Sequence, residues 1–393
     1  MPWKSCTAME EKKNFIYDWL SGQYSKSELC RAYGISRPTG DLLIKKYNAG
    51  GLCGLVDRRK TPHFHPLATD EEVIAEIIRF RKKHPKWGAR KIRELLLREW
   101  SSEWVPSAQT INKILRRSGL IIRQKRRPRV RPLLPNFDPE SANEIWSADY
   151  KGKFKMGDKK YCHPLTICDS FSRYLFVAKG HYRETFKSAK PVFKRIFEEY
   201  GLPKQLHTDN GAPFASIQSP KRYGRLSYWL MDLDIEPVFS DPASPQQNGR
   251  HERMHKDLKA QCARPSSYNL RSQQRKLNEF VEEYNKVRPH ESLAMKTPSE
   301  VHQLSPREMP KKIREWEYPS HFKVKRVTKN GSCRWGSYEF LKISVCAADK
   351  YIGLEEQGNG IWLVYYRRFP LGYFHQHDIV EPGKYHNLRM EKV

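Results

Sequence analysis

The amino-acid sequence predicts a multidomain protein with N-terminal all-α units, an α/β core with a mixed sheet, and a small all-β barrel at the C-terminus. Three observations support this fold class. The chain has 393 residues, which is enough for several domains. Hydrophobic residues make up 38% of it, which is enough for packed cores. The apolar pattern also changes twice, to mixed strands and helices near residue 137 and to short strands alone near residue 318.

Residues 1–50 have the apolar spacing of three short helices. The first covers residues 10–20, Ser27 begins the second, and Ser36 caps the third after an interruption at Gly34. Helix, glycine-containing turn and helix together are typical of a helix-turn-helix, although a helical hairpin without DNA contacts has the same layout. The third helix would offer DNA the side chains of Arg37, Thr39, Lys45 and Lys46.

Residues 66–122 predict a second helical DNA-binding domain, again of three helices. Thr69 and Glu72 fit a capping box for the first helix, the second begins near Gly88, and Ser107 caps the third. The outward face of this third helix carries a set suited to bases and phosphates, namely Gln109, Asn112, Lys113 and Arg116.

A basic linker is predicted over residues 123–136. Its first ten residues hold six cations and no acid, and proline and like charge keep such a segment extended. A charge run is usually a solvated linker, but between two DNA-binding candidates we expect it to follow phosphates. The cations are Arg123, Lys125, Arg126, Arg127, Arg129 and Arg131.

The charge of the whole chain also favours nucleic acid as a partner. Lysine and arginine number 72 against 44 acidic residues, a formal net charge of +28. No apolar run approaches the ~20 residues of a membrane helix, and the first residues lack a signal-peptide pattern. The eight scattered cysteines indicate free thiols in a reducing compartment.

Residues 137–305 are predicted to form the α/β domain, and residues 318–393 the β-barrel. In the barrel, Asn330-Gly331 and Asn359-Gly360 indicate hairpin turns. In the α/β domain we expect strands over 144–150, 161–168, 173–178 and 205–207, and helices over 185–200, 245–262 and 272–287.

Three acids stand out in the α/β domain. Asp149 lies in IWSADYKG at the end of a strand, Asp209 in LHTDNGAPF after another strand, and Glu252 in SPQQNGRHERMHKDLK near the start of a helix. Singly, they are explained as a strand-end acid, a turn residue and a first-turn helix acid. Taken together in one predicted domain, they favour a shared functional site over three separate explanations.

These three segments resemble the catalytic motifs of the D,D,E insertion-sequence transposases, in the retroviral-integrase superfamily, which have an RNase H-like core. The resemblance covers nearly the whole chain and extends to EYNKVRPHESLAMKTPSEV. It implies that residues 137–305 are an RNase H-like integrase core. It also implies a polynucleotidyl transferase that binds the terminal inverted repeats of a mobile element, cleaves the DNA ends and joins the 3′-OH to target DNA.

The resemblance implies that Asp149, Asp209 and Glu252 are both the catalytic residues and the metal ligands. Two Mg²⁺ ions per site are expected, with Mn²⁺ as a substitute and Asp149 bridging both, because hard cations take carboxylate oxygens. Lys256 and Lys259 share a helix face with Glu252 and would hold DNA, although an intrahelical Glu-Lys pair is the simpler explanation. A further DNA-binding candidate, at the start of this helix, is Asn248.

The chain departs from the family in one spacing. Between Asp209 and Glu252 lie 42 residues, more than is common, and we expect the extra length over 219–234 to be a surface elaboration. Glu236 competes for the role of Glu252, but it lies in a predicted strand. Structural zinc is not expected, because the cysteine and histidine spacings fit no zinc motif.

The resemblance implies double-stranded DNA as partner, both element ends and target, and a homo-oligomer that is at least a dimer. It implies no membrane partner and a place in the bacterial cytoplasm, associated with the nucleoid. Two alternatives remain open. One is a catalytically silent, transposase-derived DNA-binding regulator, and the other is an RNase H-like nuclease without strand transfer.

Overall fold

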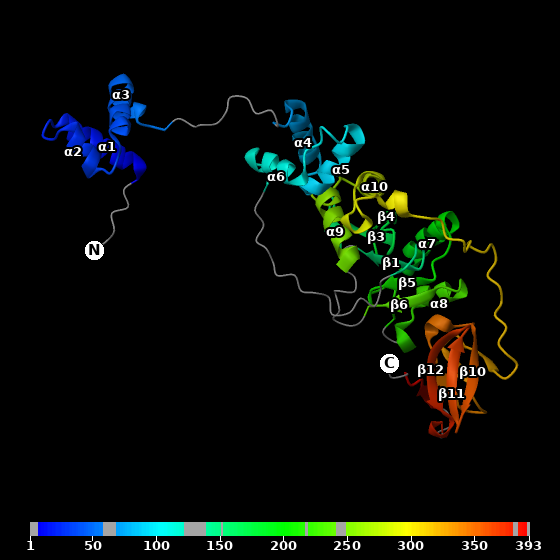
Figure 1. The fold of residues 1–393 in the computed structure, drawn as a ribbon. Helices are drawn as coiled ribbons and strands as arrows, with labels where there is room; N and C mark the ends of the chain where they lie inside the picture. Colours follow the sequence, from blue (N-terminus) through cyan, green and yellow to red (C-terminus); the bar gives the residue numbers. More distant parts are fainter. Residues whose placement is uncertain are drawn as a thin grey trace. The chain divides into compact units, whose positions relative to one another are not determined.

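The chain forms two compact units in the computed structural model, residues 1–70 and 71–393, and each is described by itself (Figure 1). None of the described helices is long and apolar enough to cross a membrane. The structure describes residues 7–57, 68–121, 139–150, 152–216, 219–240, 249–379 and 384–390.

The first unit has the three predicted helices, α1 (Ala8–Leu20), α2 (Lys26–Ala32) and α3 (Arg37–Gly54). Their apolar faces meet in one small core. Ser36 caps α3 as predicted, and Gly34 makes the preceding turn at a φ of 62°. The cap of α2 is Ser25, whose side chain accepts from the Glu28 N–H, so this helix begins before Ser27.

The second unit begins with the other predicted helices, α4 (Glu71–Lys83), α5 (Ala89–Glu99) and α6 (Ala108–Arg117). They share a core in which Ile77, Ile92 and Ile111 are fully buried. Ser107 caps α6 by accepting from the Thr110 N–H, as predicted. Since α4 begins at Glu71, Thr69 does not adjoin the helix that it was expected to cap.

A six-stranded mixed sheet forms the centre of this unit. The strand order is β2-β3-β1-β5-β6, with β4 also paired to β3. β3 is antiparallel to its three neighbours, whereas β1, β5 and β6 run parallel. The predicted mixed α/β core is therefore confirmed. Its strands are β1 (Ile145–Tyr150), β2 (Phe154–Lys155), β3 (Tyr161–Asp169), β4 (Leu175–His181), β5 (Gln205–Thr208) and β6 (Glu236–Phe239).

Helices cover the sheet through two separate hydrophobic cores. One core joins β1, β3 and β4 to α7 (Phe186–Tyr200) and α8 (Arg225–Asp232). The other joins β4 to α9 (Gly249–Cys262) and α10 (Leu270–Glu282). Phe176 belongs to the first core and its neighbour Leu175 to the second, because successive side chains of a strand point to opposite faces.

The expectation of a surface elaboration over residues 219–234 is wrong. This segment contains α8, in which the six residues 226–231 are all buried. Trp229 packs into the core of the mixed sheet, whereas Tyr228 and Met231 pack into the core of the C-terminal strands. Apolar residues on all sides of a helix indicate burial on all sides. α8 therefore joins the two cores.

The C-terminal part consists of strands, as predicted. They form two sheets that share one hydrophobic core, with strand orders β12-β11-β10-β7 and β13-β9-β8. Neither sheet closes among the described strands, so the barrel is not confirmed. Asn359 and Gly360 make the predicted hairpin turn at φ values of 51° and 72°. The strands are β7 (Lys323–Arg326), β8 (Ser332–Arg334), β9 (Phe340–Lys342), β10 (Tyr351–Gly358), β11 (Ile361–Tyr366), β12 (Phe369–His375) and β13 (Tyr385–Asn387).

Candidate active site

Two of the three predicted acids lie at the ends of neighbouring parallel strands. Ala148 of β1 lies opposite Thr208 of β5, and Asp149 and Asp209 are the residues that follow them. Because the strands are parallel, both carboxylates belong to the same edge of the sheet. The side chain of Asp149 is 18% exposed, which leaves it open to a ligand.

Asp209 follows β5 in a loop. Its Oδ1 atom accepts a hydrogen bond from the Gly211 N–H, at 3.2 Å. Burial raises the pKa of Asp209, because a desolvated carboxylate disfavours its charged form. A cation at this edge of the sheet would oppose that effect, so the site suits an oxygen-preferring metal.

The third acid, Glu252, is exposed on the first turn of α9. Lys256 and Lys259 are exposed on the same helix, as predicted. No ion pair joins Glu252 to Lys256 in the part of the chain that the structure describes. The intrahelical pair is therefore not observed, and these charges remain available to DNA.

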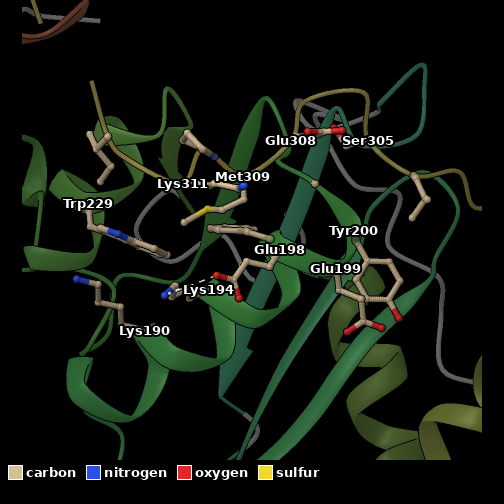
Figure 2. Close-up of a pocket in the computed structure, with 15 residues that line it drawn as sticks. Lys190, Lys194, Glu198, Glu199, Tyr200, Trp229, Ser305, Glu308, Met309 and Lys311 are labelled. Atoms are coloured by element: carbon tan, nitrogen blue, oxygen red, sulfur yellow. Dashed lines mark ion pairs between the residues drawn. The ribbon is translucent and has the colours of Figure 1, made fainter. Parts of the chain in front are cut away.

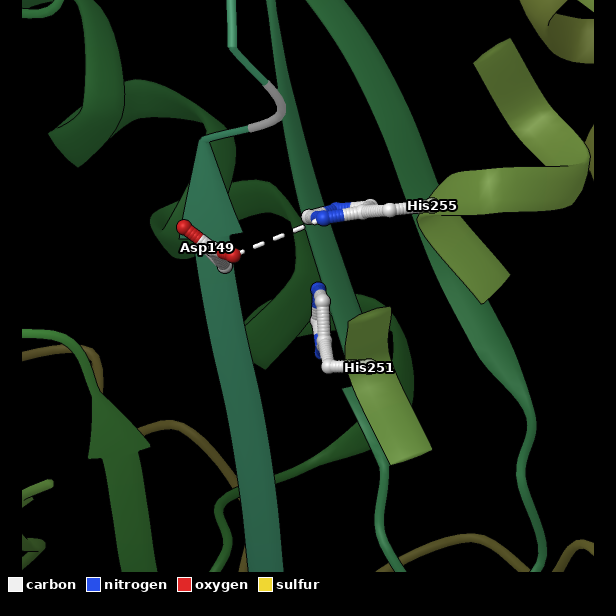
Figure 3. Close-up of side chains that lie close together, drawn as sticks. All are labelled: Asp149, His251 and His255. Atoms are coloured by element: carbon white, nitrogen blue, oxygen red, sulfur yellow. Dashed lines mark ion pairs between the residues drawn. The ribbon is translucent and has the colours of Figure 1, made fainter. Parts of the chain in front are cut away.

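Two histidines that flank Glu252 face the other way. His251 and His255 are 2% and 3% exposed, and they point from α9 toward the strand that carries Asp149 (Figure 3). Residues four apart lie on one face of a helix, and Glu252, one residue from His251, lies about 100° around it. Burial of the two imidazoles thus turns Glu252 outward.

The hydroxyl of Thr166, on β3, lies between the two imidazoles. Its Oγ1 atom is 2.7 Å from Nε2 of His251 and 2.7 Å from Nε2 of His255. The same hydroxyl donates its single proton to the Asp149 carbonyl oxygen, at 3.0 Å. Both Nε2 atoms must therefore carry protons and donate to Thr166.

The remaining imidazole nitrogens contact β1. Nδ1 of His251 is 3.0 Å from Oγ of Ser147, and Nδ1 of His255 is 3.4 Å from Oδ2 of Asp149. We call His251, His255 and Thr166 the histidine cluster. It fixes α9 to β1 and β3 beside Asp149.

Sequence reasoning missed the histidine cluster, although HERMH carried a signal for it. Two histidines four apart with a glutamate between them are typical of a zinc-binding helix. Asp149, His251 and His255 also bring three ligand atoms within 4.8 Å of one another. Here, however, both Nε2 atoms are hydrogen-bonded to Thr166, which leaves only the Nδ1 atoms as ligands for a metal. Mg²⁺ prefers oxygen ligands, so the histidines suit it poorly. Among the described residues, however, the three predicted carboxylates do not come within 4.8 Å of one another, because Glu252 points away from Asp149.

A basic groove of about 900 Å³ lies beside Glu252. Its walls come from α9 and from the helical domain of α4–α6, which also contacts the core through His84 Nδ1 and Glu283 Oε1 at 3.1 Å. Six cations outnumber three acids in it, which suits a phosphate backbone. The cations are Arg81, Lys86, Lys91, Arg253, Lys256 and Arg288.

A second cavity, of about 680 Å³, lies between α7, Trp229 and residues 304–313 (Figure 2). Lys190 lies 5.5 Å from the Trp229 ring centroid, and Lys194 Nζ is 3.6 Å from Glu198 Oε1. None of the residues predicted for the active site lines this cavity. The predicted residues lie instead at the sheet edge and beside the basic groove.

The predicted DNA-reading helices expose most of their candidate side chains. On α3, Lys46 is half-buried, whereas Arg37, Thr39 and Lys45 are exposed. On α6, all four candidates are exposed: Gln109, Asn112, Lys113 and Arg116. The other candidates lie outside the described residues, namely Arg123, Lys125, Arg126, Arg127, Arg129, Arg131 and Asn248.

Comparison with protein families matches four models to this chain. Two models of an integrase core domain match residues 139–245 and 233–298. A helix-turn-helix domain model matches residues 11–63, and a homeodomain-like domain model matches residues 39–115. Residues 139–298 are therefore an integrase core domain, preceded by helix-turn-helix domains.

Similar proteins come from insertion elements and retroviruses. The uncharacterized 39.2 kDa protein of insertion element IS476 from Xanthomonas euvesicatoria is 24% identical over 60% of this chain and 66% of its own length. The transposase InsD of IS2 from Escherichia coli is 24% identical over 62% of this chain and 81% of its own length. The Gag-Pro-Pol polyprotein of Simian retrovirus SRV-1 is 33% identical over 33% of this chain but only 6% of its own length.

Solved structures of similar proteins include two from retroviruses. The simian T-cell lymphotropic virus intasome, in complex with a phosphatase regulatory subunit, aligns with 78% of this chain and 98% of its own, at 17% identity and a TM-score of 0.37. The HTLV-2 integrase catalytic core, in complex with magnesium, aligns with 42% of this chain and 98% of its own, at 18% identity and a TM-score of 0.30.

Proposed function

We propose that this chain, which belongs to the insertion-sequence transposases of the integrase superfamily, binds the terminal inverted repeats of a mobile element, cleaves their ends and joins them to target DNA. One observation carries the proposal. Asp149 and Asp209 follow paired residues at one sheet edge, and the histidine cluster holds the helix of Glu252 beside Asp149.

Asp149, Asp209 and Glu252 would hold Mg²⁺, or Mn²⁺ in its place, with two ions per site. Their oxygen donors suit such ions, and the raised pKa of buried Asp209 would be lowered again by a bound cation. When bound, the ions supply activation of the attacking oxygen and stabilisation of the charge on the leaving oxygen.

The protein's own part in phosphodiester transfer is mainly positioning. In the first step a water oxygen attacks phosphorus at the element end, the P–O bond to the 3′ oxygen breaks, and a 3′-OH is released. In the second step this 3′ oxygen attacks phosphorus in the target, and one target strand is cut as the new bond forms. The basic groove, with Lys256 and Lys259, would hold the phosphates while the histidine cluster keeps α9 in place.

The two helix-turn-helix domains would read the inverted repeats. α3 exposes Arg37, Thr39 and Lys45, and α6 exposes all four of its candidate side chains, as a recognition helix requires. Side chains on bases would set the sequence preference, and side chains on phosphates would set the register. Because two ends must be joined together, the active form would be at least a dimer.

A strand-transfer assay tests the proposal. Labelled duplexes that carry the element's own ends are mixed with plasmid and Mg²⁺, and the wild-type chain is compared with Asp149→Asn. We expect joined products from the wild type alone. Cleavage without joining would favour a nuclease, and tight binding of the ends without chemistry in either protein would favour a DNA-binding regulator.

A further inference from the structure

A small cavity of about 270 Å³ lies where α5 meets α9 and residues 284–292. We call it the Lys91 pocket. Four cations and two carboxylates line it, and the cations are Lys91, Arg173, Arg253 and Arg288. The carboxylates belong to Asp257 and Glu291.

Lys91 is buried without a partner. It is 8% exposed, and its ammonium group makes no hydrogen bond or ion pair with any residue in the described ranges. Burial, together with the nearby Arg288 guanidinium, lowers the pKa of Lys91 to about 8. An ammonium in this position is unfavourable in the free protein, because it has lost water without gaining an acceptor. An anion in the pocket would supply that acceptor.

The two carboxylates do not supply it. Oδ2 of Asp257 is 2.5 Å from a terminal guanidinium nitrogen of Arg288, and Oε2 of Glu291 is 3.8 Å from Arg90. The Nε atom of Arg288 is itself buried without a hydrogen-bond partner in the described part of the chain. His290 adds no charge near neutral pH, because burial and the neighbouring Arg288 and Lys91 lower its pKa to about 3. The pocket therefore keeps an excess of donors and of positive charge.

The Lys91 pocket is continuous with the basic groove beside Glu252. Lys91, Arg253 and Arg288 line both cavities. Arg253 follows Glu252 directly in α9, so the pocket lies next to a candidate metal ligand. Lys91, in contrast, comes from the second helix-turn-helix domain.

We propose that the Lys91 pocket binds one backbone phosphate of the DNA strand that lies in the basic groove. This rests on the proposed function, and adds to it a contact made jointly by the helical domain and the integrase core. A phosphate matches the donors present, because an arginine fork and a lysine point charge both form charge-assisted hydrogen bonds to its oxygens. One bound phosphate would thus fix the helical domain against the core beside Glu252.

The test uses the full chain with Asp149→Asn, which keeps the DNA uncut, and duplexes that carry the element's ends. Binding is measured at several salt concentrations with and without Lys91→Met. We expect Lys91→Met to reduce the slope of log K against log salt by about 0.9, the contribution of one phosphate. The matched control is Lys194→Met, which removes an equal charge on α7 and should leave binding unchanged.

Thermal unfolding of the free protein separates binding from folding. Lys91→Met removes an unpartnered buried charge, so we expect a higher melting temperature together with weaker DNA binding. Arg253→Gln, on the exposed surface of α9, should weaken binding at an unchanged melting temperature. Two results would overturn the proposal that the Lys91 pocket binds a phosphate. One is a lower melting temperature of the Lys91→Met variant, and the other is an unchanged salt slope in both the Lys91→Met and the Arg253→Gln variants.

A scan with neutral methylphosphonates locates the phosphate. We expect one position at which the modification weakens binding by the parent protein but not by the Lys91→Met variant. If the parent protein and the Lys91→Met variant differed only in their response to the 5′-terminal phosphate, the assignment of the pocket to a backbone phosphate would be overturned. Failure of the parent protein to bind any end would overturn the proposed function, whereas failure of the Lys91 tests alone would leave that function intact.

Discussion

The Nδ1 atom of His255, on α9, lies 3.4 Å from the Oδ2 atom of Asp149, on β1. This contact joins the first predicted acid of the site to the helix that carries the third. Since His255 also donates to Thr166, the position of the helix and the position of the carboxylate depend on one another.

We expect Thr166→Val to destabilise the protein. It leaves two buried N–H donors of the histidine cluster without their acceptor, at a cost of about 1–3 kcal/mol for each donor. The free energy of unfolding by urea measures this change. Thr166→Ser keeps the hydroxyl and should therefore retain most of the wild-type free energy of unfolding. Equal stability of the Thr166→Val and Thr166→Ser variants would contradict the role of the hydroxyl.

We expect Glu252→Gln to abolish strand transfer while the protein still binds the element ends. The substitution keeps the shape of the side chain and removes the charge that the metal ions require. The matched control is Glu236→Gln, because Glu236 lies on β6 and accepts a hydrogen bond from Gln205 at 2.9 Å. Loss of joining in the control and retention in Glu252→Gln would reverse the assignment.

We expect removal of divalent metals by EDTA to abolish strand transfer without lowering the melting temperature. The Nε2 protons of His251 and His255 are bound to Thr166, so the histidine cluster needs no metal to hold α9. Differential scanning fluorimetry before and after EDTA checks this. A fall in melting temperature that zinc restores would instead identify a structural metal on these histidines.

We expect the stability of the free protein to rise between pH 8 and pH 10.5 through Lys91. Its folded pKa of about 8 lies below the unfolded value of 10.5, so in this window the unfolded chain binds more protons than the folded one. Rising pH therefore relieves the buried charge. The difference in unfolding free energy between the wild type and Lys91→Met should shrink across this window, and a constant difference would argue against a buried ammonium.

We expect Met231→Ala to destabilise the protein by about 2–5 kcal/mol, as large-to-small changes in a core do. Met231 is fully buried on α8, in the core of the C-terminal strands. The control is Arg225→Ala, an exposed change on the same helix that should shift stability by less than about 0.5 kcal/mol. Equal effects of the two changes would mean that α8 is not part of that core.

Local features were predictable from the sequence because their causes are local. Ser36 and Ser107 cap helices with their own side chains, and Asn359-Gly360 adopts the φ values that a two-residue hairpin needs. Asp149 likewise lies near the end of a predicted strand and Asp209 directly after another, and the pairing of these strands brings both acids to one sheet edge.

Features that depend on distant contacts were not predictable in this way. His251 meets Thr166 across 85 residues of sequence, so nothing near HERMH distinguishes a zinc helix from an anchored one. Lys91 is polar in an amphipathic helix and would be assigned to the surface, but the core covers it. Closure of a barrel depends on hydrogen bonds between its edge strands. The alternation of apolar and polar residues along each strand does not predict these hydrogen bonds.

The spacing between Asp209 and Glu252 also has a structural role, because α8 lies in this part of the sequence. The helix lies between these acids, and its apolar surface is divided between the core of the mixed sheet and the core of the C-terminal strands. Asp232, at its end, also pairs with Lys350 of the C-terminal part at 2.5 Å. A deletion that shortened this spacing would therefore detach one domain from another, and would not simply trim a loop. The number of residues between the two acids thus includes the helix that packs the C-terminal sheets against the core of the mixed sheet.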